Sequence, residues 1–260
     1  MKTGRLSTWL GALLGTILAL AFSAYAHGQE FTEEFHHTYP LSANGSVSIH
    51  NVNGRVRIVG STANEVKVDA VKRADSKQRL EEARIEVNSS ADRFDLRTRY
   101  PEHDSWFGSN DHAASVEYMI SVPRGSRLEA SVVNSGLEIS GVSGEVEAQD
   151  VNGQLTVTGL ASGAHLSTVN GRAEANFSSL PPSGTIHVKS VNGNVVVVIP
   201  GGANAEVRAH TLNGGVHNDF GLTPERPRYG PGSRLEGRIG SGGPTIDLEN
   251  VNGSVDIRRQ

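Results

Sequence analysis

The chain has 260 residues, 30 glycines, no cysteine and a formal net charge of −4, with 24 lysines and arginines against 28 acidic residues. The lack of cysteine excludes disulfide bonds, thiol catalysis, cysteine metal sites and a lipidated amino-terminal cysteine. An acidic balance without any basic block argues against a nucleic-acid partner.

Residues 1–26 contain the three parts of a secretory signal peptide. Lys2 and Arg5 form a basic start, residues 9–22 are apolar, and an Ala-Tyr-Ala segment ends at Ala26. The alternative is a retained membrane anchor, but the apolar stretch is shorter than the roughly 20 residues of a spanning helix. We therefore expect cleavage near Ala26 and export. The mature chain, without a membrane span, would be periplasmic, attached to the cell surface or secreted.

Seven near-copies of a phrase built around Val-Asn-Gly occupy much of the remaining chain. Their central residues are Asn53, Asn134, Asn152, Asn170, Asn192, Asn213 and Asn252. Six of these are followed by glycine, whereas Asn134 is followed by Ser135 and then Gly136. Self-similarity at a short period indicates a repeat architecture.

Apolar residues recur at fixed positions around each central asparagine: six, four and one before it, and three and five after it. In the third copy they are Val146, Ala148, Val151, Leu155 and Val157, and only the sixth copy departs, with Asn218 in the last position. The alternation within each half has the period of a β-strand. Asn-Gly between the halves tolerates left-handed backbone angles, so each copy is predicted to be a strand, a tight turn and a strand.

Two all-β folds fit this pattern. Asn-Gly between alternating strands is typical of a hairpin and would suit an antiparallel meander. A single-stranded β-solenoid would instead stack each copy on the previous one. We favour the solenoid because the apolar residue before each asparagine can then join the others inside.

The turn residues are interpreted as structural. Asparagine side chains at equivalent turns can hydrogen-bond along the stack. The residues assigned this role are Asn53, Gly54, Asn152, Gly153, Asn170, Gly171, Asn192, Gly193, Asn213, Gly214, Asn252 and Gly253.

The segments between the copies are predicted to decorate or cap the stack. Residues 60–122 contain four alternating runs that predict strands near 66–70, 85–87, 94–96 and 116–122, and residues 77–83 predict one or two helical turns. We therefore expect an N-terminal β-subdomain over residues 27–122, which includes the first copy, and solenoid repeats over 123–260. Residues 178–183 suit a corner insertion, and 221–243 a long loop or one irregular coil.

The chain resembles the bacterial putative-adhesin domains of unknown function, and the related head domains of putative autotransporter adhesins. The resemblance covers roughly residues 40–260. It is carried by the strand 116–122 running into Pro123-Arg124-Gly125-Ser126, by the serial Asn-Gly and Ser-Gly turns, and by Gly242-Gly243 before Asn252-Gly253. It implies a single-stranded β-helix in the cell envelope, and it offers no catalytic motif to transfer.

The outward positions of the repeats do not form a carboxylate cluster of the kind that polysaccharide-cutting β-helix enzymes need. Five residues before each asparagine stand Ser48, Glu129, Glu147, His165, His187, Arg208 and Asp247. Three before it stand His50, Ser131, Gln149, Ser167, Lys189, His210 and Glu249. These mixed columns suit a solvated face. His165 and His187 are expected to be neighbours, but without a third ligand we expect no metal and no cofactor.

The segment 101–112 is the better candidate for binding. It combines two histidines and two aspartates with an aromatic pair: His103, Asp104, Trp106, Phe107, Asp111 and His112. These residues could contact a partner, or could be a hairpin tip whose aromatic rings fold back on the protein. A divalent-ion site is a further alternative.

The sequence thus predicts an exported, non-enzymatic, adhesin-like binding or structural module. Its partner would be an envelope protein or a glycan. The first alternative is an envelope-stress sensor or accessory protein that binds a regulator, and the second is a polysaccharide-acting enzyme.

Overall fold

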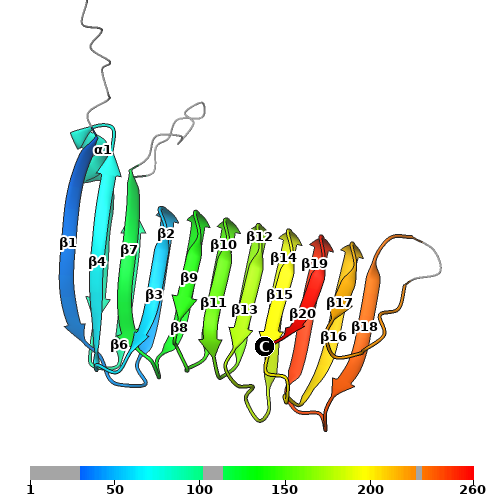
Figure 1. The fold of residues 1–260 in the computed structure, drawn as a ribbon. Coiled ribbons are helices and arrows are strands. Elements are labelled where there is room, and N and C mark those ends of the chain that lie inside the picture. Colours follow the sequence, from blue (N-terminus) through cyan, green and yellow to red (C-terminus); the bar gives the residue numbers. More distant parts are fainter. Residues whose placement is uncertain (1–29, 102–113, 227–229) are drawn as a thin grey trace, which may run out of the picture.

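The computed structural model describes residues 30–101, 114–226 and 230–260. The predicted signal peptide lies outside the described residues. Within them the protein is all-β, with two ten-stranded sheets, and the one helix in these ranges is the short α1 (Lys77–Glu82). Figure 1 shows the strands standing side by side along one axis. No helix in the described ranges is both long and apolar enough to cross a membrane.

We name the two sheets A and B. In spatial order, sheet A contains β1 (Phe31–Pro40), β4 (Glu65–Ala74), β7 (Ser115–Pro123), β3 (Val56–Ser61), β9 (Leu137–Ser140), β11 (Leu155–Leu160), β13 (Ala173–Phe177), β15 (Val195–Ile199), β20 (Val255–Arg259) and β17 (Val216–Asn218). Sheet B contains β18 (Ser233–Ile239), β16 (Ala205–Asn213), β19 (Thr245–Asn252), β14 (Thr185–Asn192), β12 (Ala164–Asn170), β10 (Val146–Asn152), β8 (Arg127–Asn134), β2 (Ser46–Asn53), β6 (Arg93–Arg99) and β5 (Arg84–Ser89).

The two strands of each copy lie in different sheets. In the third copy, for example, β10 belongs to sheet B and β11 to sheet A. Both strands pair in parallel with their equivalents in the next copy, so that Val146 lies opposite Ala164 and Leu155 opposite Ala173. The hairpin interpretation is therefore wrong for the repeats, because antiparallel hairpin strands would pair with each other.

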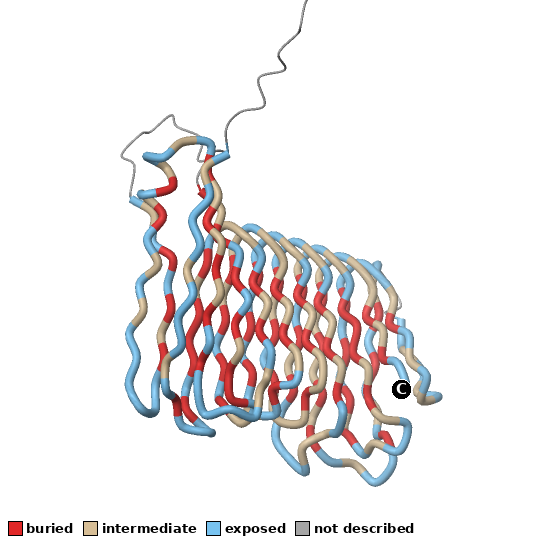
Figure 2. Tube along the Cα trace, turned by 60° about the vertical axis from the view of Figure 1, so that its left-hand side comes forward, coloured by how far each residue is buried: buried red, intermediate tan, exposed pale blue. Residues whose placement is uncertain are grey.

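The core lies between the sheets, and Figure 2 shows buried residues alternating with exposed ones along the strands. The predicted apolar positions six and four before, and three and five after, each asparagine are buried, as at Val146, Ala148, Leu155 and Val157. The position directly before the asparagine was wrongly expected to be inside. Leu212 there is 49% exposed, because the strand alternation continues to the end of the strand and directs this side chain outward.

A buried polar column takes the inward position two residues before each asparagine. Its members are Asn51, Asp150, Thr168, Ser190, Thr211 and Asn250, with Val132 in the second copy. Three of them donate to a glycine carbonyl of the adjacent copy: Ser190 to Gly171 at 3.2 Å, Thr211 to Gly253 at 3.0 Å and Asn250 to Gly193 at 2.8 Å. These bonds satisfy carbonyl oxygens at the turns.

The turn glycines are required by close backbone contact between copies. A Cβ added at Gly171 would lie 1.7 Å from the carbonyl oxygen of Gly153, and one at Gly193 would lie 1.8 Å from that of Gly171. Positive φ angles, predicted for the Asn-Gly turns, occur at the glycines Gly54, Gly171, Gly193 and Gly253. They do not occur at the asparagines, because among the described non-glycine residues only Ser135 has a positive φ. Glycine is needed at these turns both for this backbone conformation and because a side chain would collide with the neighbouring turn.

The turn asparagines form a hydrogen-bonded row along the outside of the stack. In the order given below, each side-chain amide after the first donates to the side-chain oxygen of the asparagine before it, at 2.8–3.0 Å. The row runs in the order Asn53, Asn134, Asn152, Asn170, Asn192, Asn252 and Asn213.

The order of copies in the stack departs from their order in the chain at the C-terminal end. The seventh copy, β19 and β20, lies between the fifth and the sixth in both sheets. Residues 221–243, expected to be a long loop or irregular coil, contain β18, which pairs antiparallel with β16 at the edge of sheet B. The expectation that each copy stacks on the preceding one is therefore wrong for the last copy.

The N-terminal part extends the same two sheets. The four predicted strands of residues 60–122 are present as β4, β5, β6 and β7, and the predicted helical turns are present as α1. Strands β6 and β7 pair in parallel with β2 and β3 of the first copy. Beyond them β4, β5 and β1 pair antiparallel with their neighbours. Strand β1 was not anticipated from the sequence.

Candidate functional site

The binding segment expected at residues 101–112 lies outside the described residues, apart from Pro101. This applies to all six residues singled out there: His103, Asp104, Trp106, Phe107, Asp111 and His112. Among the described residues, the candidate site lies at the C-terminal end of the stack, over β16, β18 and β19.

The insertion of the seventh copy brings opposite charges together on the outer face of sheet B. Asp247 of β19 lies between His187 of β14 and Arg208 of β16, and Glu249 lies between Lys189 and His210 in the same way. His187 Nδ1 is 3.3 Å from Asp247 Oδ2, and Lys189 Nζ is 3.3 Å from Glu249 Oε2. If the copies had stacked in chain order, basic side chains would have faced basic side chains here.

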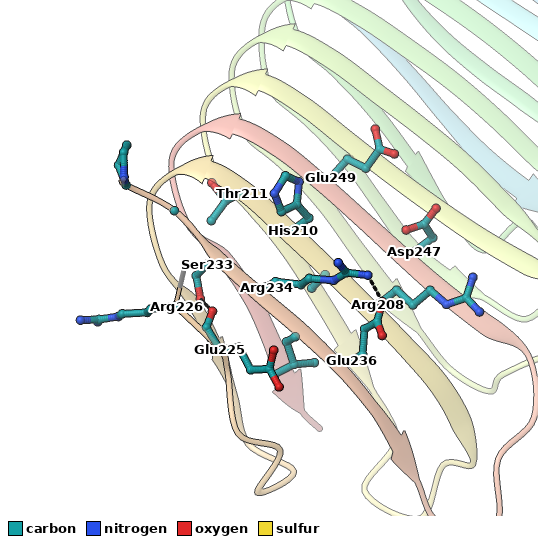
Figure 3. A pocket seen from close by; sticks show the side chains of 14 residues that line it. Arg208, His210, Thr211, Glu225, Arg226, Ser233, Arg234, Glu236, Asp247 and Glu249 are labelled. Carbon is teal, nitrogen blue, oxygen red and sulfur yellow. Dashed lines mark hydrogen bonds and ion pairs between the residues drawn. The ribbon is translucent and has the colours of Figure 1, made fainter. Parts of the chain in front are cut away.

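A cleft of about 470 Å³ opens on this face over β16, β18 and β19. Figure 3 shows its labelled side chains rising from these strands, with Glu225 and Arg226 on the segment beside them. The charged side chains that line it are Arg208, His210, Glu225, Arg226, Arg234, Glu236, Asp247 and Glu249. No aromatic ring other than that of His210 lines the cleft within the described part of the chain.

The cations of the cleft differ in how they are paired. Arg234 forms an ion pair with Glu236, and its guanidinium lowers the pKa of that carboxyl. Arg208 and His210 have no ion pair with any residue that the structure describes, although Asp247, Glu249 and Glu236 are on adjacent strands. Arg208 also lowers the pKa of the Glu236 carboxyl, less than Arg234 does. Because neither Arg208 nor His210 forms an ion pair with a described residue, both exposed donors can bind a ligand oxygen.

The arrangement suits the recognition of polar groups. Guanidinium and imidazole donors beside carboxylate acceptors can hydrogen-bond hydroxyl, carboxylate and amide groups of a ligand. Most of these donors and acceptors stand on β16, β18 and β19, which are paired strands of one sheet. The backbone pairing therefore holds them in a fixed register.

His165 and His187 are neighbours on adjacent strands, as expected, with ring centroids 6.2 Å apart. His187 also lies beside Asp247. Within the described ranges no group of three or more histidine, aspartate or glutamate side chains is placed to hold a metal ion.

Sequence reasoning named Arg208, His210, Asp247 and Glu249 only as members of a solvated face, and it missed Arg234 and Glu236 of β18. One observation could have found the cluster. Asp247 and Glu249 complement His187 and Lys189 on one side, and Arg208 and His210 on the other. Charge matching between copies therefore favours the inserted order over the chain order.

No family model and no curated protein matches the chain. Among solved structures, it is similar to a putative cell adhesion protein from Clostridium sporogenes, with 13% identity, 89% of this chain and 100% of that chain covered, and a TM-score of 0.47. A putative adhesin from Bacteroides fragilis has 12% identity, coverage of 89% and 97%, and a TM-score of 0.32. A putative lipid binding protein from Parabacteroides distasonis has 12% identity, coverage of 90% and 98%, and a TM-score of 0.27. Likenesses of this strength assign no function.

Proposed function

We propose that this protein is an exported, non-enzymatic binding module of the cell envelope, with an adhesin-like role. The observation that carries the proposal is the charged cleft on the outer face of sheet B. Its donors, Arg208 and His210, are exposed and have no ion pair among residues 30–101, 114–226 and 230–260. We propose that they bind a polar group of an envelope protein or a glycan.

We further propose that the module is a single-stranded β-solenoid. The parallel, in-register pairing of equivalent strands supports this, since each copy contributes one strand to each sheet. In this proposal residues 27–122 cap the stack at its N-terminal end and residues 123–260 carry the repeats. A rigid stack of this kind holds the cleft at a fixed distance from the other end of the molecule.

The proposal is tested by the binding of the purified protein to envelope material, before and after protease digestion of that material. Binding that survives digestion indicates a glycan, and binding that is lost indicates a protein. The cleft variant Arg208→Ser/His210→Ser is expected to lose at least about tenfold in affinity, because exposed charged hydrogen bonds are removed from the contact.

The matched control is Glu129→Ser/Glu147→Ser, which changes two exposed side chains on the same face of sheet B, on β8 and β10. This control is expected to bind like the unchanged protein. A third variant, Trp106→Ala/Phe107→Ala, tests the separate proposal that the 101–112 segment contacts the partner. Equal binding of the cleft variant and the control would remove the cleft from the account.

A further inference from the structure

Strand β1 presents a long and regular open edge. It pairs with β4 over ten consecutive residues without a shift in register, and it is the terminal strand of sheet A. The other terminal strands are shorter, with three residues in β17, seven in β18 and six in β5. No described strand pairs with the outer side of β1, and an edge of this length has backbone amide and carbonyl groups that can pair with another strand.

Two of the usual devices that protect an edge are absent from β1, which contains no lysine and no bulge, and its one proline, Pro40, is the last residue of the strand. Its charged residues are Glu33 and Glu34. Its inward face has a row of rings: Phe35 stacks on His37 with centroids 4.5 Å apart, and Tyr39 lies 5.3 Å from Phe94. Phe35 and Tyr39 are only partly buried, so these rings would gain burial from a neighbouring strand.

The sequence of β1 is self-complementary when it is read against a reversed copy of itself about Phe35. Phe31 then faces Tyr39, and Thr32 faces Thr38. Glu33 faces His37 and Glu34 faces His36, so that every carboxylate meets an imidazole. Opposite charges and aromatic pairs directly across an antiparallel ladder stabilise it.

The edge strand β18 provides a contrast. Reversed about its central residue, it would set Glu236 against Glu236 and Arg234 against Arg238. Like charges directly opposite each other destabilise a ladder. The complementarity of β1 is therefore not a general property of the edges of this protein.

We propose that β1 pairs antiparallel with β1 of a second, identical chain about Phe35. Sheet A of one chain and sheet A of the other then form one continuous sheet. The two-fold axis of such a pair is perpendicular to the sheet, so the inward faces of both chains stay on the same side. The ring rows of the two chains then meet across the junction.

The contacts that β1 already makes within the chain are compatible with this pairing. His36 Nδ1 is 2.7 Å from Asp69 Oδ1 and Glu33 Oε2 is 3.1 Å from Lys72 Nζ, and both partners are on β4. These contacts are on the side away from the open edge. His36 Nε2 also lies 3.3 Å from Glu34 Oε2 of the same strand. In the proposed pair, this Glu34–His36 contact of each chain meets the same contact of the second chain across the junction.

The register is tested by cysteine crosslinking, which the cysteine-free chain makes unambiguous. Thr32→Cys and Thr38→Cys are prepared as separate proteins, mixed and oxidised. The proposed register puts position 32 of one chain opposite position 38 of the other, with Cα atoms about 4.5 or 5.5 Å apart, inside the range for a disulfide. The mixture is expected to form a linked dimer.

Each single variant oxidised alone is the matched control. Positions 32 and 32 of two chains would be offset by six residues, roughly 20 Å along the strand, so no linked dimer is expected. Light scattering of the unchanged protein should give twice the chain mass. A monomer at every concentration, or a dimer whose mixed variants do not crosslink, would overturn the proposal.

A charge exchange tests the proposed pairs. His36→Glu places glutamate opposite Glu34 at two points of the dimer and is expected to weaken dimerisation by about tenfold. Adding Glu34→Lys to the same chain sets lysine opposite each new glutamate and is expected to restore it. Failure of the second change to restore dimerisation in a folded protein would count against this register.

Discussion

The middle of the stack and its C-terminal end use the same repeat in different ways. From β8 to β15 the copies follow one another in chain order, and their turns pack backbone against backbone. At the C-terminal end the seventh copy is inserted before the sixth, and β18 adds an antiparallel edge. The buried core runs through both regions, as at Val146 in the middle and Ile246 at the C-terminal end. The irregular end brings Asp247 and Glu249 between basic side chains and forms the cleft.

We expect the largest effect from a substitution that disrupts the packing between turns in the middle of the stack. In Gly171→Ala the new Cβ would lie 1.7 Å from the Gly153 carbonyl oxygen, at a residue with φ of 151°. Overpacking and backbone strain together should lower the free energy of unfolding by roughly 3–5 kcal/mol, measured by denaturant unfolding.

Two glycines sharpen this comparison. In Gly214→Ala the new Cβ would lie 1.9 Å from the Gly253 carbonyl oxygen. The sixth copy is at the end of the stack, where β18 is its only further neighbour among the described strands, so it can shift more easily. We therefore expect a smaller loss in the free energy of unfolding. Gly202→Ala has no atom within 4 Å of its Cβ and should be nearly neutral. An equal loss in all three would mean that contact between turns does not set the glycine requirement.

The second effect concerns the buried polar column. Asp150 is 2% exposed, and no side chain among the described residues hydrogen-bonds its carboxyl group. The backbone N–H groups of Asn152 and Val151 only partly offset the effect of burial. Burial raises the pKa of Asp150 to about 7. The folded protein therefore binds a proton that the unfolded chain releases above about pH 4, so stability should fall as the pH rises from about 4 to about 7 and then level off.

Asp150→Asn should remove this dependence. Asparagine is uncharged and can donate to backbone carbonyls, as Asn250 does in the same column. We expect a gain of about 2–3 kcal/mol at pH 8 and little change near pH 4, measured by denaturant unfolding at both pH values. The reciprocal change Asn250→Asp should introduce the same pH dependence at the C-terminal end. A flat pH profile in the unchanged protein would contradict the burial of a neutral carboxyl.

The sequence was sufficient to locate the core because the apolar positions follow one strict pattern. Val146, Ala148, Leu155 and Val157 could be placed inside from their spacing alone, as could their equivalents in other copies. The inward position of Asp150 was missed, since its polar side chain contradicts the usual content of a core. Val151 was placed inside because it is apolar, although strict alternation assigns it to the outer face.

The position of the seventh copy could not be read from spacing. The interval between Asn213 and Asn252 leaves room for an extra strand, but parallel pairing by backbone hydrogen bonds is the same for any two copies. Only side-chain complementarity distinguishes the neighbours. The cleft depends on that order. The sequence therefore identifies its outward-facing residues but does not predict that they lie together.

The most direct test of the account is the order of the last copies in the stack. Two variants are compared by oxidation in the cysteine-free background: Lys189→Cys/Glu249→Cys and Lys189→Cys/His210→Cys. Adjacent strands are about 4.8 Å apart, within reach of a disulfide, whereas strands two places apart are beyond the roughly 7 Å limit. We expect an intramolecular disulfide in the first variant and none in the second. A disulfide in the second variant alone would show that the copies stack in chain order and would contradict the account.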